Sequence, residues 1–303
     1  MSPKTLGGSI RRSEWVVLVF LIYVLALLRF LPVAPAVEHR IALWNWAMVF
    51  VYMILLCIGF LKPAAWVDIA RDWLPLAVVL LAYREMGWLA QPHASALLES
   101  RWIVWDRFLL RGGVKAGIEV FGPVLPSILE VAYSLVYTLA PLSIGILYVS
   151  GYRGRVDDFL FVFVLAVLLC YAQFPFWPSE PPRSLFSGQD APSYDTVFRH
   201  FNLWMLGKYG IHTSVFPSAH VAGAFAAAFG MRQAAPARKW VNGLLLLVAI
   251  LIAVATVYGR YHYVSDAMVG FLIAAAVSLA FAFRPERRSA HSGLVGSLEL
   301  YGN

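Results

Sequence analysis

Two short stretches of the sequence carry side chains whose types and spacing could do chemistry. VFPSAHVAGAF, at residues 215–225, places a serine and a histidine at the start of an apolar run. YGRYHYVSDAMVGF, at residues 258–271, places His262 and Asp266 at the start of another. Residues at i and i+4 share one face of a helix. A carboxylate so placed can hold one imidazole nitrogen and leave the other free as a nucleophile or base.

The same stretches predict a site for an anion. Pro217 is tolerated at a helix start and Ser218 is a typical N-cap. The unpaired backbone N–H groups of a first helical turn attract anions, and His220 lies within that turn. Arg260 precedes His262 by two residues, and the proline-stiffened stretch PSEPPRSLF (178–186) supplies Arg183, which we expect on the same side of the protein.

This set of groups fits phosphoryl transfer. Cations and N–H groups cradle the phosphoryl oxygens, a nucleophile attacks in line, and an acid protonates the leaving oxygen. Two histidines and an aspartate could instead hold zinc, but two arginines would repel a cation, so we expect no metal and no cofactor. A serine hydrolase is also disfavoured, because Ser218, at a helix start two residues before His220, is better placed to donate to phosphate.

The elements that must position these residues are membrane helices. The chain has 303 residues, of which 60% are hydrophobic and 14% charged, whereas soluble domains carry about a quarter charged residues. The first apolar run lacks a signal-peptide cleavage site. Cys57 and Cys170 fall in apolar runs, where small buried hydrophobes are expected. Eight spans are predicted, at about 15–34, 41–61, 73–90, 124–148, 158–176, 217–231, 240–258 and 262–283.

Basic residues predict how these spans are oriented. The short segments GYRGR and RQAAPARK and the RPERR tail are all basic and fall on one side, which is typical of the cytoplasmic face. Both termini are then cytoplasmic, and both histidine stretches open onto the extracytoplasmic face. The net charge of +7 therefore needs no nucleic-acid partner. The amphipathic stretches 96–113 and 193–210 predict interfacial helices on the outer face, and small residues at four-residue intervals in 219–230 predict close helix packing.

The quoted motifs resemble a known family. FPSAH (216–220) and GRYHYVSD (259–266) are similar to the second and third motifs of the type 2 phosphatidic acid phosphatase superfamily. PPR (181–183), WDRFLLRGG (105–113) and DWLPLAVVLLAYRE (72–85) resemble the branch that contains inositol phosphorylceramide synthase, an inositolphosphotransferase of sphingolipid metabolism. The sequence departs from the superfamily pattern at Phe176, Ser184, Ala219 and Thr256, which concerns the phosphate cradle rather than the histidine pair.

The resemblance implies an all-α polytopic membrane protein with a six-helix catalytic core over residues 70–284. Two N-terminal spans (1–69) and a disordered cytoplasmic tail (285–303) complete the expected organisation. His262 would attack phosphorus to form a phosphohistidine, with Asp266 orienting it and His220 acting as acid and then base. The implied phosphate ligands are Arg183, Arg260, Ser218 and the N–H groups of the helix start, including that of Ala219.

The expected function is transfer of a phospho-headgroup from a membrane lipid to a lipid alcohol, without a metal. A lipid or polyprenyl phosphate phosphatase, which uses water as the acceptor, is the nearest alternative because it would share the motifs. A non-catalytic lipid-binding or transport protein would keep the anion site and need the histidines only as hydrogen-bonding groups. A structural scaffold would give no reason for the clustered ionisable groups. The sequence leaves open the roles of Arg84, Glu85 and the 184–214 segment.

Overall fold

The computed structural model describes residues 10–90, 96–211 and 213–283, and within these ranges every regular element is a helix. The expected disordered tail at 285–303 lies outside the described residues. The α-helices are α1 (Arg12–Leu27), α2 (Pro35–Leu61), α3 (Ala65–Leu89), α4 (Leu97–Leu109), α5 (Lys115–Glu119), α6 (Val124–Leu135), α7 (Leu139–Val149), α8 (Val156–Tyr171), α9 (Pro182–Leu185), α10 (Val197–Tyr209), α11 (Ala219–Ala234), α12 (Lys239–Tyr258) and α13 (Val264–Ala282).

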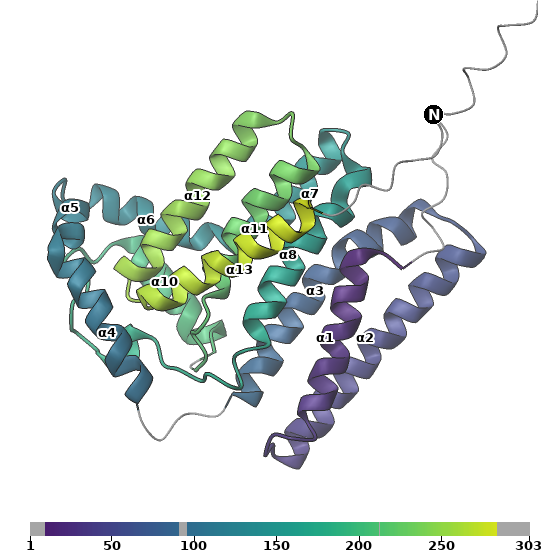
Figure 1. Cartoon of the computed structure of the whole chain (residues 1–303), viewed down its shortest axis with the longest axis horizontal. Coiled ribbons are helices and arrows are strands. Elements are labelled where there is room, and N and C mark those ends of the chain that lie inside the picture. The colour runs from purple at the N-terminus through teal and green to yellow at the C-terminus, as the bar shows by residue number, and fades with distance from the viewer. Residues whose placement is uncertain (1–9, 91–95, 212, 284–303) are drawn as a thin grey trace, which may run out of the picture.

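The helices form one bundle around α11 (Figure 1). α11 packs against α8, α12 and α13, so protein surrounds it on most sides. α1 and α2 stand beside α3 at one edge of the bundle, and α4 and α5 lie at the opposite edge. The division expected at residue 69/70 falls within α3, and it stays a prediction.

The chain is a polytopic membrane protein with an all-helical fold. α2, α12 and α13 are each long and apolar enough to cross a membrane, and α4–α5 with α6 form a pair bent by 107° that would count as one more span. The other expected spans are shorter or more polar. α1, α8 and α11 have 16 residues each, about 24 Å of helix at 1.5 Å per residue. The expected span 124–148 is wrong as one helix, because the chain turns between α6 and α7.

The outside of the bundle is apolar, as a lipid-facing surface requires. Large exposed side chains on the spanning helices include Phe50 and Phe60 of α2, Leu247 of α12 and Leu272 of α13. Cys57 lies on this surface of α2, so the expectation that it is buried is wrong, whereas Cys170 is buried as expected. Both thiols are free.

Charged groups join the N-terminal helices to the rest of the bundle. The Arg71 guanidinium on α3 lies 2.6 Å from the Glu14 carboxylate on α1, and both side chains are fully buried. Arg11 bridges Asp68 and Asp72 of α3 at 2.7 and 2.6 Å. These pairs balance the charge that burial would otherwise make costly. They lie at the end of the bundle where α1 and α3 begin.

Glu85, the acidic residue within the third expected span, has a hydrogen-bond partner on a neighbouring helix. Glu85 of α3 is fully buried, and its carboxylate accepts a hydrogen bond of 2.8 Å from the Asn45 amide of α2. A carboxyl group within a membrane bundle requires such a partner. Glu85 thus contacts a neighbouring helix and does not line the cavity described below.

The two expected amphipathic helices are present as α4 and α10, and both bury polar groups while exposing aromatic ones. α4 buries Glu99 and Asp106 and exposes Trp105 and Phe108. α10 buries Asn202, and it exposes Phe198, Phe201 and Trp204. Their polar sides bind the bundle, and their aromatic sides suit the headgroup level of a bilayer.

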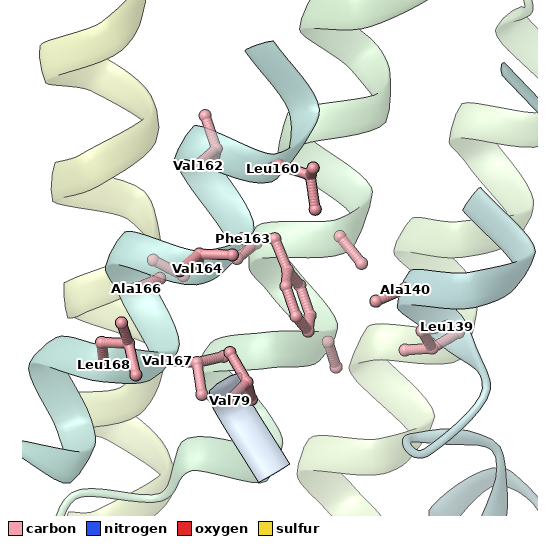
Figure 2. Close-up of a cluster of buried hydrophobic side chains, with 14 of the residues drawn as sticks. Val79, Leu139, Ala140, Leu160, Val162, Phe163, Val164, Ala166, Val167 and Leu168 are labelled. Carbon is pink, nitrogen blue, oxygen red and sulfur yellow. The ribbon is translucent and has the colours of Figure 1, made fainter. Parts of the chain in front are cut away.

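α11 and α8 pack closely at the small residues for which close packing was predicted. A Cβ atom at Gly223 would lie 3.3 Å from Val167, and one at Gly230 would lie 3.1 Å from a ring carbon of Phe159. Figure 2 shows this part of the core, where Phe163 of α8 projects toward Ala140 of α7. The absence of side chains at the two glycines lets the helix backbones approach.

We expect Gly230→Leu to lower the free energy of unfolding by about 2 kcal/mol, because the side chain would overpack against Phe159. Thermal unfolding in detergent would show a midpoint lower by about 5 °C. Gly243→Leu is the matched control, since Gly243 of α12 has open space around its Cβ position. Equal midpoints for the two variants would contradict the packing described here.

Candidate active site

The structure brings the two predicted histidines into contact. His220 lies in the first turn of α11, and His262 lies in the loop between α12 and α13. His220 Nδ1 is 3.2 Å from His262 Nε2, and the ring centroids are 5.4 Å apart. Two side chains 42 positions apart in the chain therefore face one point.

The starts of α11 and α13 are held together by backbone contacts. The Ser218 N–H donates to the Asp266 carbonyl at 3.0 Å. Gly270, one turn further along α13, approaches so closely that a Cβ atom there would lie 2.4 Å from the Ser218 carbonyl oxygen. Only glycine fits this approach, which sets the separation of the two histidines.

His262 is oriented mainly by a backbone carbonyl. Its Nδ1 lies 2.9 Å from the Val215 carbonyl oxygen and 3.4 Å from Asp266 Oδ2. Because a carbonyl oxygen only accepts, Nδ1 carries the proton and Nε2 keeps its lone pair. Nε2 is the nitrogen that faces His220.

The geometry expected for Asp266 needs correction. α13 begins at Val264, so His262 precedes the helix rather than sharing its face. Asp266 instead acts in a capping box, in which its Oδ2 accepts the Tyr263 N–H at 2.9 Å. The carboxylate fixes the start of α13 and faces the His262 ring at a longer distance.

Both histidines line a cavity of about 250 Å³, whose lining extends from the segments that carry Arg183 and His262 to helices α3, α7 and α8. Arg183 lines its polar end, where the guanidinium donates to the Tyr261 carbonyl at 3.3 Å. Its deep end is apolar, with Leu76 and Val79 from α3, Ala140 from α7 and Phe163 from α8. The cavity thus pairs a cationic, imidazole-bearing end with a hydrocarbon-like end.

The predicted anion ligands at the start of α11 differ in whether they line the cavity. Ala219 lines the cavity. Ser218 is confirmed as the N-cap of α11, since its Oγ accepts the Val221 N–H at 3.3 Å. Ser218 is fully buried and does not line the cavity. Ala219 and His220, the first two residues of α11, both line the cavity.

Arg260 is the predicted phosphate ligand that the structure turns away from the cavity. Its Nη1 binds the buried Asp106 carboxylate of α4 at 2.6 Å, and it is not among the cavity-lining residues. α12 ends at Tyr258, so Arg260 lies in a turn rather than on a continued helix. Arg183 is therefore the arginine that faces the two histidines.

Several aromatic residues at the site were not predicted. Tyr133 of α6 stacks on the His220 ring at 5.3 Å and on Tyr261 at 4.2 Å between centroids. The Tyr261 hydroxyl donates to Glu130 Oε2 at 2.6 Å. Glu130 interrupts the apolar run SILEVAYSL, and an acid within such a run is the signal that could have drawn attention to it.

The 184–214 segment is tied to the core at two places. Arg199 and Asn202 of α10 bind Glu130 at 3.0 and 2.8 Å. Asp190 is bound by Arg111 and Arg107 at 2.8 and 3.2 Å. Partial burial alone would raise the pKa of Asp190, but its hydrogen bonds with Arg111 and Arg107 outweigh burial and lower it. The segment is thus joined by ion pairs to α6 and to the residues around the end of α4.

No group of three His, Cys, Asp or Glu side chains in the described part of the chain is arranged to hold a metal ion. The two histidines face an arginine instead. The chemistry available from these groups is attack by a neutral imidazole, proton transfer by a second one, and stabilisation of negative charge by a guanidinium.

A comparison with known protein families identifies the family of this chain. The family model described as PAP2 superfamily matches residues 118–280, a range that contains both histidines and Arg183 and covers more than half of the chain. The chain belongs to the PAP2 superfamily, whose members are phosphatases or phosphotransferases, and it is an integral membrane enzyme of that type. Searches of curated proteins and of solved structures gave no match.

We expect Gly270→Ala to lower turnover by about tenfold or more, because a methyl group there must push the starts of α11 and α13 apart. Steady-state assays of the purified variant would measure the loss. Met268→Ala is the control, since Met268 is exposed on the same helix. Wild-type turnover in Gly270→Ala would show that the spacing of the two helix starts is not critical.

Proposed function

We propose that this chain transfers a phospho-headgroup from a membrane phospholipid to a lipid alcohol through a phosphohistidine on His262. The observation that carries the proposal is the His220–His262 contact at the cationic end of a cavity whose other end is apolar. The apolar end suits an acyl or alkyl chain, and the cationic end suits a phosphoester. A lipid phosphoester has both parts in the same order.

The first step follows from the orientation of the two rings. His262 carries its proton on Nδ1, so the lone pair of Nε2 is available and would attack phosphorus. The bond from phosphorus to the lipid oxygen would break, and doubly protonated His220 would give that oxygen a proton. Arg183 and the N–H groups at the start of α11 would hold the phosphoryl oxygens, and Asp266 would keep the start of α13 in place.

The second step reverses the proton transfer. His220, now neutral, would take the proton of the acceptor hydroxyl, whose oxygen attacks phosphorus as the P–N bond to His262 breaks. The products are a new lipid phosphoester and a neutral His262. A lipid alcohol is the favoured acceptor because the deep part of the cavity is apolar, and the resemblance to inositol phosphorylceramide synthase points to an inositol phosphate headgroup. Water as acceptor would make the enzyme a phosphatase.

The site is proposed to open on the extracytoplasmic face, with both termini cytoplasmic. Arg11, Arg153 and Arg155 lie at the starts of α1 and α8, whereas the histidines lie at the starts of α11 and α13. The clustering of these arginines at loops and helix starts fits the charge bias of cytoplasmic segments. Residues 1–69 are proposed as an N-terminal two-helix unit attached to a catalytic core at 70–284.

The test is incubation of the purified protein with a panel of phospholipids and polyprenyl phosphates, with and without a lipid alcohol. A new lipid phosphoester that forms only with the alcohol is the expected product. Release of free phosphate without it would identify a phosphatase. A chelator should leave turnover unchanged, because the proposed steps use only imidazole and guanidinium groups.

We expect His262→Gln to lower turnover by about 10³-fold or more while lipid affinity changes by less than about threefold, because the nucleophile is lost and the cavity remains. Lipid affinity would be measured in nanodiscs with a fluorescent lipid. His200→Gln is the control, since His200 is an exposed histidine of α10 that contacts only Asp195 among the described ion pairs. Unchanged turnover in His262→Gln would support a binding or transport protein instead.

A further inference from the structure

The loop that carries His262 is held by a carboxylate from a distant helix. Asp106 of α4 is fully buried. Its Oδ2 lies 2.6 Å from Arg260 Nη1, and its Oδ1 accepts the Val264 N–H at 2.8 Å. These partners are the second residue before His262 and the second residue after it. One side chain therefore binds the loop on both sides of the proposed nucleophile.

Arg260 lies directly after the end of α12. Its φ of +65° is that of a Schellman ending, in which the Arg260 and Tyr261 N–H groups donate to the Val257 and Thr256 carbonyls at 3.1 and 2.9 Å. The backbone turn is therefore formed locally, and Asp106 acts on the Arg260 side chain and on the Val264 N–H. The Arg260 side chain is also almost fully buried, and in the described structure its Nε and Nη2 have no hydrogen-bond partner. The Asp106 carboxylate is thus the anion that balances the buried charge of Arg260.

Other contacts hold α4, the helix that carries Asp106, in place. Glu99, on the same helix, accepts the Glu180 N–H at 3.2 Å. Arg107 and Arg111 bind Asp190. Neither contact involves residues 260–264. α4 is therefore anchored independently of the loop, and Asp106 can transmit its position to that loop.

We propose that Asp106 is a positioning residue that holds His262 Nε2 in line with the phosphorus atom by clamping Arg260 and Val264. The proposal rests on the proposed function for its kinetic consequence. It also assigns Arg260 a place in the clamp rather than in the phosphate cradle. Asp106 itself does not line the cavity, so it acts through the loop.

The clamp can be tested without any substrate. Hydrogen–deuterium exchange of the purified protein would compare wild type with Asp106→Asn and Asp106→Ala. Loss of a charge-assisted hydrogen bond should speed exchange in a peptide covering residues 260–266 by about tenfold, and should leave α8 and α11 unchanged. Asp106→Asn keeps one acceptor oxygen and the shape of the side chain, so it serves if the alanine variant does not fold.

Kinetic measurements distinguish a positioning role of Asp106 from a role in stabilising the fold alone. We expect Asp106→Asn to lower kcat by about 10²-fold, since small displacements of a reacting group have effects of that size, with KM changed by less than about twofold. Glu99→Gln is the matched control, because it also neutralises a buried carboxylate of α4 that is close enough to act electrostatically on Tyr263 and Asp266, but Glu99 accepts its hydrogen bond from the Glu180 N–H and not from residues 260–264. It should leave exchange at 260–266 and kcat within about threefold of wild type.

Each possible outcome supports or contradicts a separate part of the proposal. Unchanged exchange at 260–266 in both Asp106 variants overturns the clamp, and faster exchange with unchanged kcat overturns the positioning role. Equal loss of kcat in Asp106→Asn and Glu99→Gln would mean that α4 acts only as a structural support. If the wild-type protein turns over no lipid, the proposed function fails, while the exchange result still decides whether the clamp exists.

Discussion

The contact between the starts of α11 and α13 is the constraint on which the rest of the site depends. Two imidazoles can share one phosphoryl group only if their helices begin side by side, and here the backbones meet at Ser218, Asp266 and Gly270. This contact requires a glycine at position 270 of α13. Gly270 is therefore part of what places His220 beside His262, whereas the glycines of α11 pack against α8.

The outer helices complete the site by turning their polar groups inward. In a soluble protein a helix such as α4 would expose its acids, but here Asp106 and Glu99 are buried and the aromatic side chains face outward. Buried acids need partners, and the partners available are the backbone and arginine groups of the catalytic loops. Burial at the membrane surface thus ties α4 to Arg260 and Val264, and α10 to Glu130 through Arg199 and Asn202.

Much of this could be predicted from local sequence, and the rest could not for identifiable reasons. The helix start at Ser218, the existence of the amphipathic helices α4 and α10 and the close packing of α11 all follow from short-range patterns, and the structure confirms them. The direction of Arg260 depends on Asp106, 154 positions away in the chain, and no local pattern encodes that pair. The same holds for Tyr133 beneath His220. The single span expected at 124–148 failed because hydropathy does not report a turn within an apolar run.

The central claim is that His262 forms a covalent bond to phosphorus in the course of the reaction. The most direct measurement is rapid quenching of the purified enzyme with a lipid whose phosphorus is radiolabelled, followed by peptide mapping. The account predicts label on the peptide that contains His262, stable in base, labile in acid and absent in His262→Asn. An enzyme that turns over the same lipid without any label on His262 during the reaction would contradict it.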